Sequence, residues 1–216
     1  MSMNILVAGF EPFGGETVNP ALEAARRLHG LQLGTHKVAA MQLPCEFGAS
    51  IRALEQQMAQ LQPGIVLCVG QAGGRSSIDV ERVAINVDDA RIPDNAGLQP
   101  IDEPVIAGGP AAYFSGLPIK AITAALVAAG IPSSVSQTAG TYVCNHIFYG
   151  LSHLVATQFP SVRGGFVHIP YLPEQAARQP GAASMSLDTI VAGLTLVLQT
   201  TIAVTHDIKR QGGQTH

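Results

Sequence analysis

The stretch Ile65-Val66-Leu67-Cys68-Val69 decides the fold. All five residues are apolar, Pro63-Gly64 precedes them, and Gly70 follows them. A short run that is apolar on both faces, bounded by turn residues, is typical of a strand deep in a parallel sheet, where helices cover both faces. The sequence therefore predicts a buried central strand over 65–69.

Outward from this strand, short apolar runs alternate with amphipathic segments. Further strands are predicted over 4–9, 37–43, 78–87, 133–137 and 165–169, and helices over 19–29, 46–61, 119–129, 144–157 and 186–205. This alternation predicts an α/β fold with a mostly parallel, twisted central sheet. No linker divides the chain, so we expect one catalytic domain over 1–205 and a disordered polar tail over 206–216.

Composition argues against several classes of protein. Of the 216 residues, 12% are charged and 47% are hydrophobic, which predicts a large core and further surface buried between subunits. A formal charge of −3 without a Lys/Arg cluster argues against a nucleic-acid partner. No apolar run is long enough for a membrane span, and no segment resembles a signal peptide. Three widely spaced cysteines form no disulfide framework, so we expect a cytoplasmic protein.

Ligands of open α/β sheets bind beyond the carboxyl ends of the strands, which directs attention to the segments that follow strands. Two glycine-rich segments, 9–15 and 70–75, follow strands, but neither has the spacing of a phosphate-binding motif. Residues 88–118 are rich in Pro, Gly and Asp, and this long segment is interpreted as a functional lid or loop, or as an oligomer arm. Asp88 and Asp89 have no metal-ligand spacing with a nearby histidine, so no metal is expected.

Cys144 is the candidate nucleophile. It begins a predicted amphipathic helix, on the face that carries Ile147 and Leu151. Unpaired N–H groups and a partial positive charge at a helix N-terminus both favour a thiolate. A buried structural cysteine is the alternative interpretation. Cys68 is expected in the core, whereas Cys45, between a strand and a helix, is a weaker candidate for the nucleophile and could line the site.

His168 is the candidate base among seven histidines. It lies at the carboxyl end of the predicted strand 165–169, where α/β enzymes place catalytic groups. A packed histidine bonded to backbone is the alternative. His146 and His153 fall on the helix face opposite Cys144 and are expected to be solvated.

Glu81 is the candidate that orients the imidazole. Its parity within the predicted strand 78–87 places it on the inward face, where an unpaired carboxylate is costly and a histidine would satisfy it. The apolar phase shifts near this residue, so a bulge is plausible. A surface ion pair with Arg82 or Arg75 remains the alternative.

Taken together, several long motifs resemble the pyroglutamyl peptidase type I family of cysteine peptidases. The resemblance covers about residues 4–200, and the motifs stand in the family's order. They are Gly9-Phe10-Glu11-Pro12-Phe13-Gly14-Gly15 with Asn19-Pro20, Gly70-Gln71-Ala72-Gly73-Gly74-Arg75, Glu81-Arg82-Val83-Ala84-Ile85-Asn86, Asp89-Ala90-Arg91-Ile92-Pro93-Asp94-Asn95, Thr138-Ala139-Gly140-Thr141-Tyr142-Val143-Cys144-Asn145 and Gly164-Gly165-Phe166-Val167-His168-Ile169-Pro170-Tyr171.

The resemblance implies a three-layer α/β/α domain and a homo-oligomer, a tetramer or dimer, without a cofactor. It implies a catalytic triad of Cys144, His168 and Glu81. It further implies three kinds of substrate-binding group. The apolar wall for a lactam ring consists of Phe10, Phe13, Ile92 and Val143. The hydrogen-bonding groups are Asn19 and Gln71, and Arg91 is the cation near the nucleophile that assists the oxyanion.

The implied activity is removal of N-terminal pyroglutamate from peptides by acyl transfer through a thioester. Two alternatives remain open on the sequence. A related hydrolase could act on another small amide or ester, because the triad alone does not select pyroglutamate. A non-catalytic α/β protein that binds a small molecule would explain the glycine loops, but it would not explain Cys144, His168 and Glu81 in one chain.

Overall fold

The computed structural model describes residues 3–213. A seven-stranded sheet has the order β2-β3-β1-β4-β9-β5-β8, and a second sheet pairs β6 with β7. The elements in chain order are β1 (Asn4–Phe10), α1 (Pro20–Leu28), β2 (Gln32–Leu33), β3 (His36–Leu43), α2 (Ala49–Leu61), β4 (Ile65–Gln71), β5 (Ile78–Glu81), β6 (Val83–Ile85), β7 (Ala112–Phe114), α3 (Ile119–Ala128), β8 (Ser133–Ser136), α4 (Val143–Thr157), β9 (Arg163–Ile169), α5 (Pro173–Ala176) and α6 (Leu187–Ala203).

The main sheet is mostly parallel, which confirms the predicted fold class. Strands β3, β1, β4 and β9 run in one direction, and β4 lies between β1 and β9. Strand β5 is antiparallel to β9 and parallel to β8, so these two strands run the opposite way. The carboxyl ends of β1, β4 and β9 therefore meet at one edge of the sheet.

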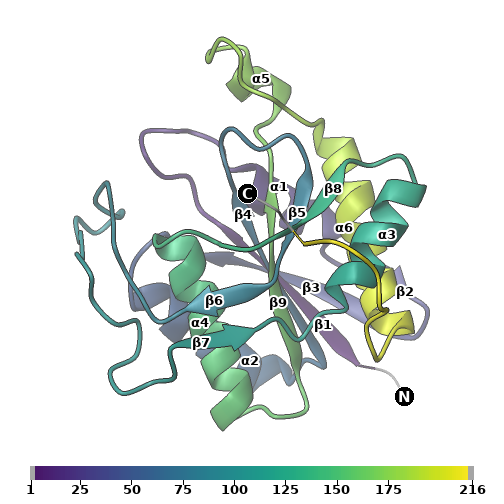
Figure 1. The fold of residues 1–216 in the computed structure, drawn as a ribbon, viewed down its shortest axis with the longest axis horizontal. Coiled ribbons are helices and arrows are strands. Elements are labelled where there is room, and N and C mark those ends of the chain that lie inside the picture. Colours follow the sequence, from purple (N-terminus) through teal and green to yellow (C-terminus); the bar gives the residue numbers. More distant parts are fainter. Residues whose placement is uncertain (1–2, 214–216) are drawn as a thin grey trace.

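Alternation along the strands divides the core into two layers. In β4, Ile65, Leu67 and Val69 pack into a core shared with α1, α3 and α6. Val66 and Cys68 point to the opposite face, into a core shared with α2 and α4. Figure 1 shows α3 beside α6 and α4 beside α2, with the sheet between them. The result is the three-layer α/β/α arrangement.

The predicted strand 78–87 is two strands in two sheets. Strand β5 ends at Glu81 within the main sheet, and after Arg82 the chain leaves it to form β6, which pairs antiparallel with β7. The prediction of a bulge within one strand is therefore wrong. The shift in apolar phase marks the point where the chain passes from the main sheet to the second sheet. Glu81 is consequently the last residue of a buried strand.

Residues 206–213 differ from the expected disordered tail. Asp207 accepts hydrogen bonds from the backbone N–H groups of Lys120 and Ala121, both at 2.9 Å. These N–H groups belong to the first turn of α3 and have no partner within the helix, so the carboxylate caps it. The remainder of the predicted tail, residues 214–216, lies outside the described residues.

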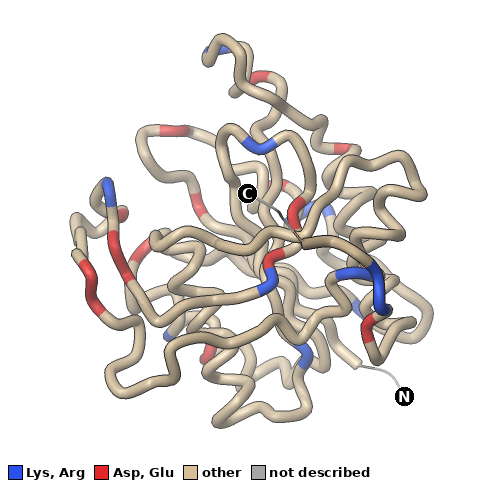
Figure 2. The backbone as a smooth tube through the Cα atoms, viewed as in Figure 1, with Lys and Arg blue, Asp and Glu red and all other residues tan. Residues whose placement is uncertain are grey.

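The segment between β6 and β7 is long and irregular, as predicted. It folds back on itself through a bridge between Asp88 and Glu103, and acidic residues recur along it, at the left of Figure 2. Within residues 3–213, no helix combines the length and the apolar character that crossing a membrane requires.

Candidate active site

The catalytic candidates lie on one face of the sheet. Phe166 packs into the core beneath α2 and α4, so His168, two residues later in β9, points to the same side. Strand pairing places Asp79 directly opposite His168. Glu81, two residues beyond Asp79, shares that face. Helix α4, which carries Cys144, covers it.

His168 and Glu81 form a buried pair. His168 Nδ1 lies 2.7 Å from Glu81 Oε1, with 4% of the histidine and none of the glutamate exposed. A carboxylate oxygen only accepts, so the proton of the neutral imidazole is assigned to Nδ1, and Nε2 carries the lone pair. This tautomer is the one a general base needs. The structure thus favours the orienting role of Glu81 over a surface ion pair.

Cys144 lies over the backbone of Gly70. A Cβ atom added to Gly70 would lie 2.9 Å from Cys144 Sγ, so the sulfur occupies the space that a side chain would fill. Gly70 is paired with His168 across the neighbouring strands β4 and β9. Adjacent strands are about 4.8 Å apart, so this register brings the thiol and the imidazole together.

The start of α4 provides unpaired donors. Its N-cap, Tyr142, makes no side-chain capping hydrogen bond. The first N–H groups of a helix have no partner within it, and they point outward with a partial positive charge. Those of Val143 and Cys144 lie beside the thiol and could stabilise an oxyanion.

Burial opposes the thiolate that the helix start was expected to favour. It raises the pKa of the Cys144 thiol, and nearby Cys45 and Glu81 add to this, while Arg75 acts against it. Burial lowers the pKa of His168, although the hydrogen bond to Glu81 partly compensates. The resting pair is therefore a neutral thiol and a neutral imidazole. Burial also raises the pKa of Cys45 and Cys68 to about 12, so position, not acidity, distinguishes Cys144.

These directions predict a broad pH profile for kcat/KM. His168 must be neutral to accept a proton, and its pKa lies below the ordinary 6.5; activity should fall only when the pH drops below that value. The pKa of Cys144 lies above the ordinary 9.0, so the alkaline limb should begin above it. Initial rates across this range test the prediction. A narrow bell centred near neutral pH would instead indicate a resting thiolate–imidazolium pair.

Gly70→Ala should reduce kcat by about a hundredfold, because a displacement of about 1 Å at a reacting group can cost that much. The added Cβ would meet both Cys144 Sγ and Phe166 Cζ, at 2.9 and 2.7 Å. The matched control is Gly213→Ala, where a Cβ meets no atom within 4 Å. Kinetics and thermal melting of both variants check this. Wild-type kcat in a folded Gly70→Ala protein would contradict the placement of the sulfur.

A cavity of about 620 Å³ opens at the N-terminal end of α4. Three segments distant in the sequence line it: the loop after β1, the segment between β6 and β7, and the residues just before Cys144. Its lining residues are Phe13, Asp89, Arg91, Ile92, Gly140, Thr141 and Tyr142. The rings of Phe13 and Tyr142 lie 6.1 Å apart.

Apart from Asn19, the predicted substrate-binding residues divide into three groups. Phe13, Arg91 and Ile92 line the cavity. Phe10 and Val143 do not line it; they are buried in the core on the α2/α4 side of the sheet, at 2% and 1% exposure. Gln71 ends β4, and its Oε1 accepts a hydrogen bond from Gln175 Nε2 at 3.0 Å, which orients its amide.

Asn19 does not fit its expected role. Its Oδ1 accepts from Ala21 N, its Nδ2 donates to Glu11 O, both at 3.0 Å, and only 1% of the residue is exposed. The side chain is engaged in capping α1 and in holding the loop after β1. We therefore leave it out of the pocket.

His146 is a second correction. It is 4% exposed, not solvated; its Nδ1 lies 2.8 Å from Asp88 Oδ2, and its Nε2 accepts from Gly48 N at 2.8 Å. The segment between β6 and β7 covers the helix face that was expected to meet water. His153 is half-buried and bonds Tyr113 at 2.9 Å. His146 thus fastens the pocket segment to α4.

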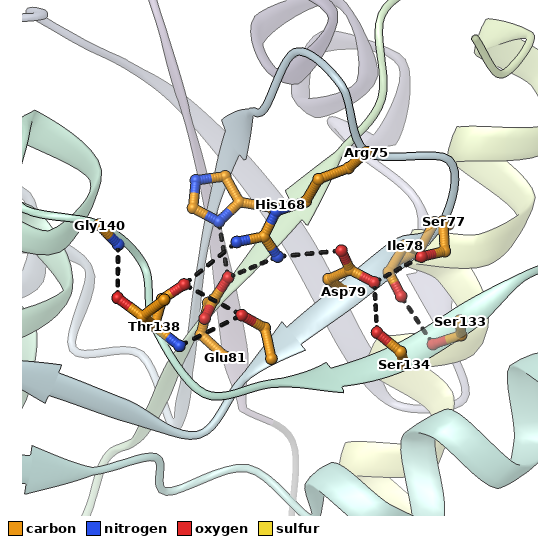
Figure 3. Close-up of polar contacts among 11 residues, drawn as sticks. Arg75, Ser77, Ile78, Asp79, Glu81, Ser133, Ser134, Thr138, Gly140 and His168 are labelled. Carbon is orange, nitrogen blue, oxygen red and sulfur yellow. Dashed lines mark hydrogen bonds and ion pairs between the residues drawn. The ribbon is translucent and has the colours of Figure 1, made fainter. Parts of the chain in front are cut away.

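Sequence reasoning missed Tyr142 and the role of Arg75. Tyr142 could have been found from the sequence, because it is an aromatic residue two positions before the candidate nucleophile. Arg75 was considered only as a surface partner of Glu81. In Figure 3 its guanidinium lies between Glu81 and Asp79, in a network that includes His168.

The site combines an imidazole oriented by a buried carboxylate with a thiol at the start of a helix. This arrangement of groups is typical of an α/β cysteine hydrolase. Comparison with known proteins agrees with this class. The family model described as pyroglutamyl peptidase matches residues 3–204. The chain belongs to this family, and it is therefore a cysteine peptidase.

Individual relatives extend over nearly the whole chain. A pyrrolidone-carboxylate peptidase of Cupriavidus pinatubonensis is 59% identical over 213 residues, covering 98% of this chain and 99% of the relative. The crystal structure of pyroglutamyl peptidase I from Bacillus amyloliquefaciens has a TM-score of 0.93 at 51% identity, covering 95% and 100%. A mutant pyrrolidone carboxyl peptidase of Pyrococcus furiosus has a TM-score of 0.91 at 41% identity, covering 93% and 99%.

Proposed function

We propose that this chain removes pyroglutamate from the N-terminus of peptides, with Cys144 as nucleophile, His168 as acid and base, and Glu81 as the group that orients the imidazole. The observation that carries the proposal is the buried Glu81–His168 pair on the sheet face where the Cys144 thiol rests on Gly70. A cavity large enough for a small ring lies against the residues just before Cys144. Membership of the family supports the choice of substrate.

The reaction is acyl transfer in two halves. The Cys144 proton moves to His168 Nε2 as Sγ attacks the pyroglutamyl carbonyl, and the N–H groups at the start of α4 bind the oxyanion; each such donor contributes about 2.7–4 kcal/mol in other enzymes. His168 then protonates the leaving amine, which leaves a thioester. Water, deprotonated by His168, cleaves the thioester and restores the thiol. Glu81 stabilises the imidazolium at each step.

The cavity suits a flat, uncharged ring. Phe13, Ile92 and Tyr142 offer apolar surface to a lactam, while Asp89 and Arg91 bring one charge of each sign to the same cavity. We place Gln71 Nε2 as the donor to the ring carbonyl, because its Oε1 is held by Gln175. Arg91, exposed at the cavity, is placed to assist the oxyanion.

Pyroglutamyl amides should be cleaved far faster than prolyl or glutaminyl amides. Proline matches the ring in size but lacks the carbonyl and brings a charged amine. A site that hydrogen-bonds a substrate group rejects an analogue without it by about 10⁴–10⁵ in favourable cases. Matched fluorogenic amides, compared by kcat/KM, test this. Prolyl turnover within tenfold of pyroglutamyl turnover would refute the pocket while leaving the triad intact.

We further propose a cytoplasmic homo-oligomer, a dimer or tetramer. Three free cysteines, two of them buried, suit a reducing compartment. Leu98, Ile101 and Phe114 are 54%, 71% and 77% exposed, and large apolar side chains at this exposure suit burial between subunits. Sedimentation of the purified protein distinguishes a monomer from an oligomer.

A further inference from the structure

Arg75 lies between two buried carboxylates of β5. Its Nη1 is 2.9 Å from Asp79 Oδ2 and 3.0 Å from Glu81 Oε1. That Glu81 oxygen is the one that accepts from His168 Nδ1 at 2.7 Å. One carboxylate oxygen thus joins the guanidinium to the imidazole, as Figure 3 shows.

The two carboxylates need a cation. Asp79 and Glu81 are alternate residues of one strand, so both point to the same face, and they are only 6% and 0% exposed. Two like charges in a buried site repel each other, and a cation between them offsets this repulsion. Glu81 Oε2 has no hydrogen-bond partner among the described residues. The polar contacts of the Glu81 carboxylate are therefore made at Oε1, where arginine supplies a permanent cation.

Asp79 is held by other donors as well. Its Oδ1 accepts from Ser77 Oγ at 2.6 Å and from Ser134 Oγ at 2.7 Å. The carboxylate is thereby fixed to β8 and to the loop before β5. Asp79 in turn fixes Arg75, so the guanidinium stands in a defined position at Glu81.

Arg75 also reaches the segment that leads into α4. Its Nη2 donates to Thr138 O at 3.1 Å. Thr138 belongs to a compact turn, in which Ser136 Oγ donates to Thr138 O and Gly140 N donates to Thr138 Oγ1, both at 3.0 Å. The same guanidinium thus contacts the acid of the triad and the turn that precedes Cys144.

We propose that Arg75 is a positioning residue of the active site: it balances the charge of Glu81 and holds its carboxylate at His168, and it ties this pair to the segment that carries Cys144. The inference rests on the proposed catalytic role of these three residues. A purely structural role for Arg75 would stabilise the loop before β5 without affecting the titration of the site.

The charges around His168 fix the direction of the test. The groups that face it are Glu81 and Asp79 on β5, Arg75 on the loop after β4, and Cys144 on α4. After burial, which has the largest effect, Glu81 and Asp79 raise the pKa of His168 and Arg75 lowers it. Loss of Arg75 therefore makes His168 easier to protonate, which removes activity at a higher pH than in the wild type.

Arg75→Met should lower kcat by about ten- to hundredfold, the range for one hydrogen bond to a charged group, with little change in KM. The acid limb of kcat/KM should move up by about one pH unit. Arg82→Met is the matched control, because Arg82 directly follows Glu81 in the chain. Its Nε donates to Gln137 Oε1 at 2.8 Å, and its side chain forms no hydrogen bond or ion pair with a triad residue in the described part of the chain. It should keep the wild-type profile.

Asp79→Asn should move the acid limb in the opposite direction, because it removes a charge that raises the pKa of His168. If Arg75→Met does not fold, this variant carries the test. An unchanged acid limb in either folded variant, or an upward shift in Asp79→Asn, would overturn the proposal.

A second readout does not need turnover. Arg75 lowers the pKa of the Cys144 thiol, so at a fixed neutral pH, iodoacetamide should modify Cys144 about tenfold more slowly in Arg75→Met, as expected for a shift of about one pKa unit. Peptide mapping identifies the modified cysteine. Wild-type protein that hydrolyses no pyroglutamyl amide would refute the proposed function, while the alkylation rates would still decide the role of Arg75. Equal rates in Arg75→Met and the wild type would overturn it.

Discussion

Cys144→Ala is expected to lower the turnover of a pyroglutamyl amide by at least about 10⁴-fold, in line with removal of a nucleophile in other hydrolases. Without the sulfur, the proposed thioester cannot form. The fold should survive, because the change removes one half-buried atom at the first turn of α4. Steady-state kinetics and circular dichroism measure the two quantities.

The controls are the other two thiols. Cys45 and Cys68 are 2% and 0% exposed, and Cys45→Ala and Cys68→Ala should lose stability through small cavities while keeping most of their kcat. Hydrolysis by Cys144→Ala within tenfold of the wild type, together with its loss in Cys45→Ala, would assign the nucleophile to Cys45.

His168→Ala should approach the loss seen for Cys144→Ala, because residues that act as a unit have effects that do not add. Glu81→Gln should be milder, with a loss below about 10⁴-fold, the loss that the amide replacement causes in a serine protease triad, where the wrong tautomer results. Arg75 explains why: its Nη1 donates to Oε1, which holds the amide oxygen toward both Arg75 and His168 Nδ1. A glutamine here keeps the tautomer and loses only the charge that stabilises imidazolium.

Both variants are measured by kcat on the same substrate. His153→Ala is the matched control for His168, since its ring bonds Tyr113 on the outer side of α4. A Glu81→Gln loss as large as that of His168→Ala would mean that the amide turns its nitrogen toward His168. Near-wild-type turnover in His168→Ala would remove the imidazole from the mechanism.

Local patterns were sufficient to predict the triad candidates. Cys144 begins an amphipathic helix, His168 ends a buried strand, and the parity of Glu81 placed it inward; the structure brings Glu81 and His168 into contact on the sheet face that α4 covers. Each prediction depended only on the element that carries the residue. The order of the strands then determined which of them meet.

The role of Arg75 could not be predicted in this way. It depends on two carboxylates that meet one guanidinium, and on β5 running antiparallel to β9. No sequence period encodes the direction of a strand relative to one formed about ninety residues later. The same limit explains the error at His146. A helical wheel identifies the apolar face, but it cannot show that Asp88 and its segment cover the polar face.

In the proposed reaction one thiol, Cys144, carries the acyl group. Titration of the protein with iodoacetamide, with residual hydrolysis and peptide mass maps taken from the same samples, tests this role most directly. Activity should fall in one-to-one proportion to modification of Cys144, and a saturating pyroglutamyl substrate should slow both. Full activity in protein whose Cys144 is completely modified, or loss of activity that follows Cys45 instead, would contradict the account.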